Sequence, residues 1–485
     1  MMSARAGIRR SIATGWSSAA LLLVHGCALQ SYTPKPIDAA ASEQAFEMRG
    51  VDAPGLKEYM LHHGLADSDW PVRSWGLTEL TLLAFYYQPD LQVARAGAAV
   101  ARADASVAGQ PAPITVTPEV LHHNLQVPDT TGLWGVGVGV EIPIATGTRR
   151  QALSEHYRLL ADSAALSVGV VAWQVRAGVR ERLLDVYAAQ AGEQRLREEA
   201  QARQEVVRLL ERRLEQGAIS AAEVGEARLR LVELDAQLQA AQARREQSRA
   251  ELAQALGVPL ETARPLVLDF SAFERAPAAP NDAQTQRSAL HNRFDVRAKL
   301  LEYAAEDAVV RLEIAKQYPS LILKPAYLWD QGDNIWALGM QLILPPALGN
   351  KPGIQAAEAR RDLAAQQFVN LQSKVIAEVQ TARVRYVNAV KGTERADALV
   401  SLSQQRSERV RKRFDTGYAD RVELATAEME TAAARRIALG LRIEAQRTLG
   451  QLEDALQVPL LGAPRLDVPE GASLPDPRAR DLAHR

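Results

Sequence analysis

Side chains that could carry out chemistry are sparse in this sequence, and none of them forms a recognisable catalytic set. Two of the eight histidines form the pair His122-His123 on a predicted strand. Neighbouring side chains on a strand point to opposite faces, so this pair is a poor start for one metal site. No GxxxxGK[ST] loop that could cradle a nucleotide phosphate is present. We therefore predict that the protein is not an enzyme and needs no metal and no cofactor.

A glycine-containing turn occurs twice, as RLEQGAIS at 213–220 and RFDTGYAD at 413–420. At the same offset of 200 residues, ten residues recur unchanged: Arg213, Gly217, Glu223, Ala227, Leu252, Ala255, Leu256, Val258, Pro259 and Leu260. A match of this length indicates an internal duplication. The resulting division of the chain is a first repeat at 77–260, a linker rich in proline and alanine at 261–287, a second repeat at 288–460, and a polar C-terminal tail at 461–485.

Each repeat is expected to be mainly helical. Ala, Leu, Arg, Glu and Gln dominate, and aromatic residues make up 5% of the chain, a composition typical of long helices that pack on one another. The proline-free run 147–214 would extend roughly 100 Å as one helix. We predict helices over 147–214 and 221–256, and over 352–414 and 421–456. The turns at 213–220 and 413–420 would then be the tips of two helical hairpins.

Four short segments have the alternation of strands, namely 113–123, 133–144, 319–330 and 335–345. Two of them carry a stripe of apolar residues at every second position, which places each stripe on one face. The stripes are Trp134, Val136, Val138 and Val140 in the first repeat, and Trp336, Leu338, Met340 and Leu342 in the second. The other two strands are interrupted by Pro118, Lys324 and Pro325. About 10 residues with this pattern suffice to cross a bilayer, although a half-buried sheet of a soluble protein has the same alternation.

The N-terminus has the features of a secretory signal. Arg5, Arg9 and Arg10 precede the apolar run 12–24, which is too short to span a bilayer. The sequence VHGC ends at Cys27, the single cysteine, and resembles the lipobox of bacterial lipoproteins. We expect a lipoprotein signal peptide at 1–26, acylation of Cys27 and a periplasmic segment at 27–76. An ordinary cleavage site beside an incidental cysteine is the alternative.

The duplicated order of helix, strand pair, long helix, glycine turn and helix resembles the TolC-like outer-membrane factors of bacterial tripartite efflux systems. The resemblance extends from Asp90 to Pro459. It implies a mainly α-helical protein with a small β part, in which three protomers form a twelve-stranded barrel in the outer membrane and an α-helical barrel across the periplasm. Small solutes or metal ions would be exported passively. The implied partners are outer-membrane lipid, a periplasmic adaptor and an inner-membrane pump, of the resistance-nodulation-division type.

The resemblance also assigns roles to residues. The hairpin tips would contact the adaptor through Arg213, Leu214, Gly217, Ser220, Arg413, Phe414, Gly417 and Asp420. Glu223 and Glu423 would lie at the periplasmic gate, and the two apolar stripes would face lipid. Each glycine is also explained by a turn alone, and each glutamate by an exposed pair with a residue such as Arg421.

Two other classes of protein remain open at this point. A periplasmic adaptor also has a helical hairpin and an N-terminal lipid, but it should have one hairpin rather than two. A soluble coiled-coil scaffold would leave the stripes at Trp134 and Trp336 unexplained. Nucleic acid is not expected as a partner, because 57 basic and 58 acidic residues give a net charge of −1.

Overall fold

The structure is a computed structural model that describes residues 32–124, 132–144, 147–274, 289–345 and 349–460, together with Pro277 and Arg287. The chain divides into two compact units, Met1–Met48 and Arg49–Arg485. In the first unit, helix α2 (Ala39–Glu47) is capped by the carboxylate of Asp38. The expected signal peptide, Cys27 and the tail at 461–485 lie outside the described residues.

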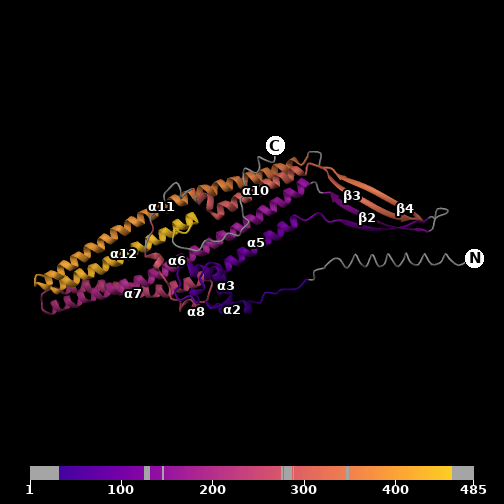
Figure 1. The fold of residues 1–485 in the computed structure, drawn as a ribbon. Coiled ribbons are helices and arrows are strands. Elements are labelled where there is room, and N and C mark those ends of the chain that lie inside the picture. The colour runs from indigo at the N-terminus through magenta and orange to yellow at the C-terminus, as the bar shows by residue number, and fades with distance from the viewer. Residues whose placement is uncertain are drawn as a thin grey trace, which may run out of the picture. The chain divides into compact units, whose positions relative to one another are not determined.

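The second unit contains the same series of elements twice (Figure 1). The first series is α4 (Leu77–Tyr87), α5 (Pro89–Ala108), β1 (Thr115–His122), β2 (Trp134–Ile144), α6 (Gly147–Glu215) and α7 (Ala221–Leu256). The second is α10 (Phe294–Ala315), β3 (Ser320–Asp330), β4 (Asp333–Ile343), α11 (Lys351–Asp415) and α12 (Arg421–Leu456). The predicted ends of the four long helices are confirmed to within one residue.

Four small elements pack beside the first series, namely α3 (Pro54–His62), η1 (Asp67–Asp69), α8 (Leu260–Ala263) and η2 (Ser271–Phe273). Leu56 and Met60 of α3 are fully buried in a hydrophobic core shared with α4, α6 and α7. Trp75 forms a parallel bridge with Leu268, which holds the segment after α8 against the start of α4. These contacts anchor the far ends of the first hairpin, away from its tip.

Pro89 explains why the helical stretch before the first strand is divided into α4 and α5. A proline has no backbone N–H and is tolerated in the first turn of a helix but not in its interior. The break falls at Gln88, whose extended backbone ends α4 and begins α5. Beyond it, Leu91 and Ala98 of α5 are buried, and α5 packs on α6.

The strands form one antiparallel sheet in the order β1-β2-β3-β4. Its central pair, β2 and β3, joins the two repeats. A two-residue turn at Gln331 and Gly332, both with positive φ, connects β3 to β4, which is the usual geometry of a tight β-hairpin. Among the described residues, the outer edges of β1 and β4 have no strand partner.

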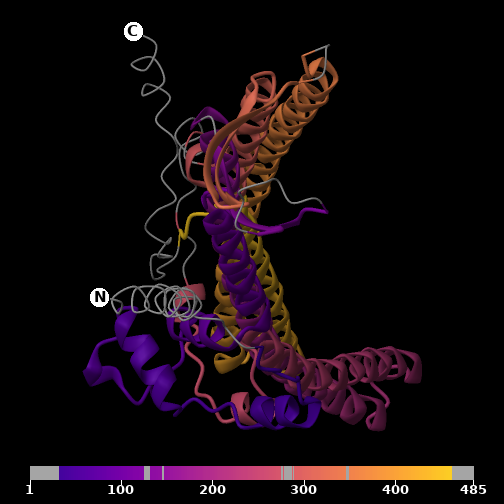
Figure 2. The same ribbon diagram turned by 90° about the vertical axis from the view of Figure 1, so that its right-hand side faces the viewer.

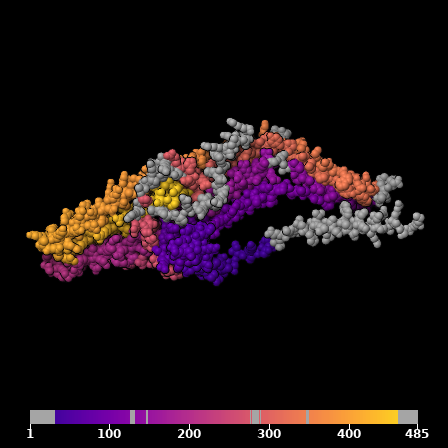
Figure 3. All heavy atoms as spheres, viewed as in Figure 1, coloured from indigo at the N-terminus to yellow at the C-terminus, as the bar shows by residue number. Residues whose placement is uncertain are grey.

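The helices of the second unit run from this sheet to the two hairpin tips. Near the sheet, α5 packs on α6, and α10 packs on both α6 and α11 (Figures 1 and 2). Toward the tips, α6 pairs with α7 and α11 pairs with α12, while α12 also packs along α6. The two hairpins end side by side, with the sheet at the opposite end of the helices (Figure 3). Two surfaces are therefore presented far apart, the sheet and the tips.

Candidate functional site

The four strands share a single apolar face. Directly opposed residues of an antiparallel pair lie on the same face of a sheet, and Val138 pairs with Tyr327, which pairs with Trp336. The predicted stripes of β2 and β4 therefore lie together. The apolar face consists of Val116, Pro118, Val120 and His122 on β1, the even-numbered residues 134–144 on β2, the odd-numbered residues 321–329 on β3, and the even-numbered residues 336–342 on β4.

This apolar face is largely uncovered. Trp336 is 79% and Leu338 is 74% exposed, and Trp134 and Val136 are also exposed. An exposed apolar surface that continues across several elements marks a contact with lipid or with another protein. Within the described residues, no other part of the chain packs on this face as a core.

The three residues that interrupt the strand pattern have different explanations. Lys324 lies on the opposite face, where its Nζ is 2.5 Å from Oε1 of Glu141 on β2. It therefore leaves the apolar face intact. Pro118 and Pro325 are on the apolar face itself, opposite Val138 and Leu338, and neither ends its strand. The strands predicted at 113–123 and 319–330 form despite these interruptions, because apolar prolines can occupy the stripe and a paired lysine can occupy the other face.

The face of the sheet opposite the apolar face carries three glycines of β2, Gly135, Gly137 and Gly139. A Cβ at Gly135 would meet Oδ1 of Asp330 at 2.8 Å. That carboxylate crosses β2 to reach His123, just beyond β1, with 2.6 Å between Oδ1 and Nε2. Glycine is required here because side chains from both sides pass over the strand. The pair ties the end of an edge strand to the centre of the sheet.

Both hairpin tips have the same backbone geometry. In the first, the N–H of Ala218 donates to the carbonyl of Arg213 and the N–H of Gly217 donates to that of Leu214. Tyr418 and Gly417 make the matching bonds in the second. This pair of bonds is a Schellman motif, which needs a left-handed residue where Gly217 and Gly417 have φ of 72° and 80°.

Glu223 and Glu423 have local partners at the start of their helices. Glu223 forms a capping box with Ser220, in which its Oε1 accepts from the Ser220 N–H and the Ser220 Oγ accepts from the Glu223 N–H. Glu423 lies 2.7 Å from Nη1 of Arg413. Arg421, the partner considered from sequence, instead lies 3.7 Å from Glu205. These local contacts alone are enough to explain why a glutamate occupies each position, whether or not the side chains line a pore.

The two hairpins are tied to each other near their tips. Nη2 of Arg213 lies 2.6 Å from Oδ2 of Asp420, and Arg436 of α12 lies 2.7 Å from Glu199 of α6. The N–H of Glu423 and the guanidinium of Arg213 lower the pKa of Asp420 below its usual value, so its carboxylate stays ionised at neutral and mildly acidic pH. Val206 and Leu209 pack on Ala425 between these pairs.

Sequence reasoning missed Tyr418. It is 79% exposed at the end of the second tip, whereas Phe414 is packed in a small cluster with Val410 and Leu424. The signal was present, because an aromatic residue directly after a turn glycine has no intrahelical neighbour to pack on. Within the described residues, no group of three or more His, Cys, Asp or Glu side chains could hold a metal ion. The helices described there contain no segment that is both long and apolar enough to cross a membrane.

Comparison with known proteins identifies this arrangement. Residues 84–258 match the family model described as outer membrane efflux protein. This match lies within the first repeat. No curated protein has a significant sequence match to the chain.

Solved structures show the same fold over both repeats of the chain. It is similar to the outer membrane protein VceC of Vibrio cholerae, at 18% identity and a TM-score of 0.62 over 78% of this chain and 95% of that chain. The outer-membrane channel OprN is 20% identical, with a TM-score of 0.63 over 89% of this chain and 99% of that chain. The CmeC outer membrane channel of Campylobacter jejuni is 14% identical, with a TM-score of 0.62 over 94% of this chain and 93% of that chain. The predicted TolC-like fold is therefore confirmed, and the adaptor alternative is not favoured.

Proposed function

We propose that this protein is the outer-membrane channel of a tripartite efflux system and acts as a homotrimer. The observation that carries the proposal is the sheet with an exposed apolar face and two unpaired edges, β1 and β4, within the described chain. An unpaired edge is costly in lipid, so a sheet in the membrane must close. Three copies would give a closed barrel of twelve strands, in line with the trimeric channels of this family.

The helices support the rest of the assignment. A helix of 69 residues, α6, extends roughly 100 Å at 1.5 Å per residue, which suits a conduit from the outer membrane into the periplasm. A channel of this kind transports passively, so the energy must come from an inner-membrane pump, for which we propose the resistance-nodulation-division type. The cargo would be small solutes or metal ions.

We assign the tips to adaptor docking. The residues involved are Arg213, Leu214, Gly217, Ser220, Arg413, Phe414, Gly417 and Asp420 from the sequence, together with Tyr418 from the structure. Tyr418 offers an exposed aromatic anchor, the kind of residue that dominates binding energy at protein interfaces. Acylation of Cys27 would anchor the chain to the outer membrane. Mass spectrometry of the N-terminal peptide would detect the lipid, and an unmodified Cys27 would remove this part of the proposal.

The gate is proposed at the tips, where six hairpin ends of a trimer would meet. Carboxylates of Glu223 and Glu423 from three chains would favour cations by Coulomb attraction. The pair of Arg213 with Asp420 would hold the two hairpins of each protomer together in the resting state. Because Glu223 also caps its helix, the test must separate its charge from its capping bond.

Single-channel conductance in a planar bilayer tests the channel and the gate together. We expect discrete, cation-preferring openings from the native protein. Glu223→Gln/Glu423→Gln should reduce cation preference, since glutamine retains a capping box but carries no charge. Glu226→Gln, which affects an exposed pair with Arg230 inside one helix, is the control. Folded protein that never inserts would refute the channel, and unchanged selectivity in the double variant would refute the carboxylate gate.

A further inference from the structure

A cavity of about 760 Å³ lies where the helices of the first repeat meet the sheet. Its walls are the end of α5, the start of α6 and the segment 110–113, which leads to β1. The two helices lie against each other at this end, where a Cβ at Gly109 would be 3.7 Å from Oγ of Ser154. Part of the lining is apolar and includes Val107, Pro113 and Leu153. We call this space the junction cavity.

Two arginines from the first turn of α6, Arg149 and Arg150, line the junction cavity. Arg149 is held by the second repeat, because its Nη1 donates to Oγ of Ser320 at 2.7 Å and its Nη2 donates to the carbonyl of Ala315 at 3.4 Å. Arg150 is exposed. Within the described chain, no carboxylate forms an ion pair with either guanidinium. Both positive charges are therefore available to an anion.

The first turn of α6 has the wrong charge for a helix that is complete without a ligand. The N-terminal end of a helix favours negative charge and disfavours positive charge. Other helices of the second unit have an acidic residue in this turn, namely Glu79 in α4, Asp90 in α5, Glu223 in α7, Asp295 in α10 and Glu423 in α12. The first turn of α6 has none and carries Arg149 and Arg150 instead. A bound anion would supply the missing negative charge.

The junction cavity also adjoins the apolar face of the sheet. Ile114 and Val116 are exposed and lead from the cavity along β1, and Val107 is exposed on α5. On β2 the apolar face ends at Ile144, shortly before the two arginines. Basic side chains next to an exposed apolar surface are typical of a membrane boundary, where they reach phospholipid head groups.

We propose that the junction cavity binds a membrane phospholipid, with its phosphate at Arg149 and Arg150 and its hydrocarbon chains toward Val107 and the apolar face. Asp104 of α5 also lines the cavity and would repel a second negative charge, which favours a head group with a single one. This inference rests on the proposed function, because lipid reaches the cavity only if the apolar face lies in the membrane. An anionic amphiphile among the cargo would have the same chemistry, so the test must separate the two sources.

Native mass spectrometry of the full-length protein in a non-ionic detergent measures this binding directly. The probes are phosphatidylglycerol, a diacylglycerol with the same chains but no phosphate, and dodecyl phosphate as an amphiphile that is not a membrane lipid. We expect phosphatidylglycerol to bind about tenfold more tightly than diacylglycerol, because charge-assisted hydrogen bonds hold its phosphate. Arg150→Ala should remove most of this difference, and Arg150→Lys should retain much of it because the charge remains.

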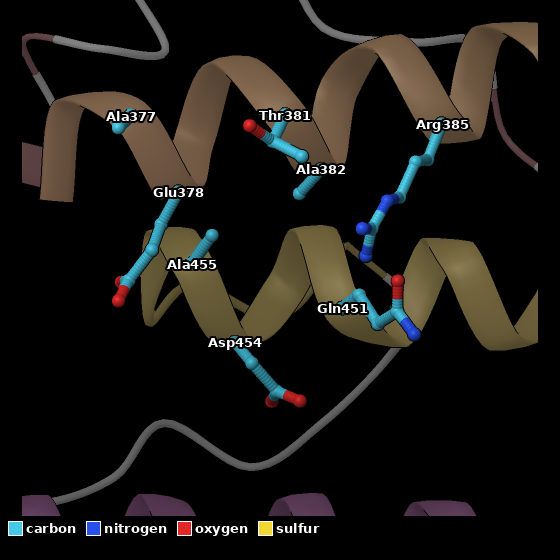
Figure 4. Close-up of a pocket in the computed structure, with 8 residues that line it drawn as sticks. All are labelled: Ala377, Glu378, Thr381, Ala382, Arg385, Gln451, Asp454 and Ala455. Atoms are coloured by element: carbon cyan, nitrogen blue, oxygen red, sulfur yellow. The ribbon is translucent and has the colours of Figure 1, made fainter. Parts of the chain in front are cut away.

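The groove between α11 and α12 supplies a matched control (Figure 4). It has a volume of about 480 Å³ and is lined by an exposed arginine, Arg385, but also by the carboxylates of Glu378 and Asp454. Two carboxylates near one arginine disfavour an anion, so Arg385→Ala should leave phosphatidylglycerol binding unchanged. Equal losses in Arg385→Ala and Arg150→Ala would overturn the proposal, since any exposed arginine would then contribute.

The remaining outcomes separate this inference from the channel proposal. Circular dichroism checks the fold of Arg150→Ala, which should be native because this side chain is exposed and has no polar partner within the described residues. Protein that conducts in a bilayer but binds phosphatidylglycerol no better than diacylglycerol would refute the lipid site and leave the channel. A preference for dodecyl phosphate would assign the cavity to cargo and overturn the lipid. Protein that never inserts would refute the channel and, with it, the lipid as the source of the head group.

Discussion

Gly217 and Gly417 are the residues on which each hairpin reversal depends. Their φ angles are left-handed, and nothing lies within 4 Å of a Cβ built at either position. The cost of Gly217→Ala/Gly417→Ala is therefore backbone strain alone, about 1 to 2 kcal/mol per site. We expect a fall of several degrees in the melting temperature followed by circular dichroism.

Gly225, in the interior of α7 and also without neighbours within 4 Å, is the matched control for the tip glycines. Gly225→Ala should raise the melting temperature, because alanine has the higher helix propensity by about 1 kcal/mol. A gain in stability at both tips would show that the turns are not as described.

Asp454 has an opposite effect on stability to most acidic residues. Its pKa is raised on folding to about 6, so the folded state holds a proton that the unfolded chain releases, and the free energy of unfolding declines as pH rises from about 4 to about 6. Asp454→Asn should raise the melting temperature at pH 7.5 and change it little at pH 4; the gain at pH 7.5 should be small, because solvent screens this exposed side chain. A variant less stable than the native protein at pH 7.5 would contradict this sign.

Among elements, the ion pairs between the hairpins should matter more for opening than for stability. Arg213 and Asp420 are both partly exposed, and exposed pairs contribute about 0 to 1 kcal/mol. We therefore expect Arg213→Ala to leave the melting temperature nearly unchanged but to increase the open probability in a planar bilayer. Arg228→Ala is the control, since it breaks an exposed pair with Glu211 inside the first hairpin. If both variants changed the open probability equally, the ion pair between Arg213 and Asp420 would have no specific role in opening.

The elements were largely predictable from sequence, whereas the contacts between them were not. A duplicated glycine turn and a proline-free run locate α6 and α11 because helix ends depend on local chemistry. Arg176 and Arg180, by contrast, have the sequence appearance of a solvated helix face, and their partner Glu453 is 277 and 273 residues away in the chain. Arg213 and Asp420 likewise belong to different hairpins, so no local pattern indicates that they meet.

At the scale of the whole molecule, the two faces of the sheet should respond differently to the same substitution. Leu338 lies on the apolar face, and Ala337 precedes it on the opposite face. An arginine facing lipid near the middle of a barrel costs about 2 to 4 kcal/mol, whereas one facing the lumen is tolerated. If the proposed trimeric barrel forms, Leu338→Arg should therefore reduce the amount of trimer in the outer membrane, and Ala337→Arg should not. Equal loss in both variants would argue against the assigned faces.

The pairing of β2 with β3 has a consequence for biogenesis. Val138 and Tyr327 are neighbours in the sheet but come from different repeats, and contacts between such distant parts of a chain form slowly, on a scale of milliseconds to seconds in small domains. Neither half of the duplicated chain can complete the centre of the sheet alone. During synthesis, β2 can pair with β1, which precedes it, but its other edge must stay unpaired until β3 follows, and its Trp and Val side chains are then open to aggregation. If the protein is the outer-membrane channel proposed above, a factor that covers this strand until its partner arrives would favour its passage to the membrane.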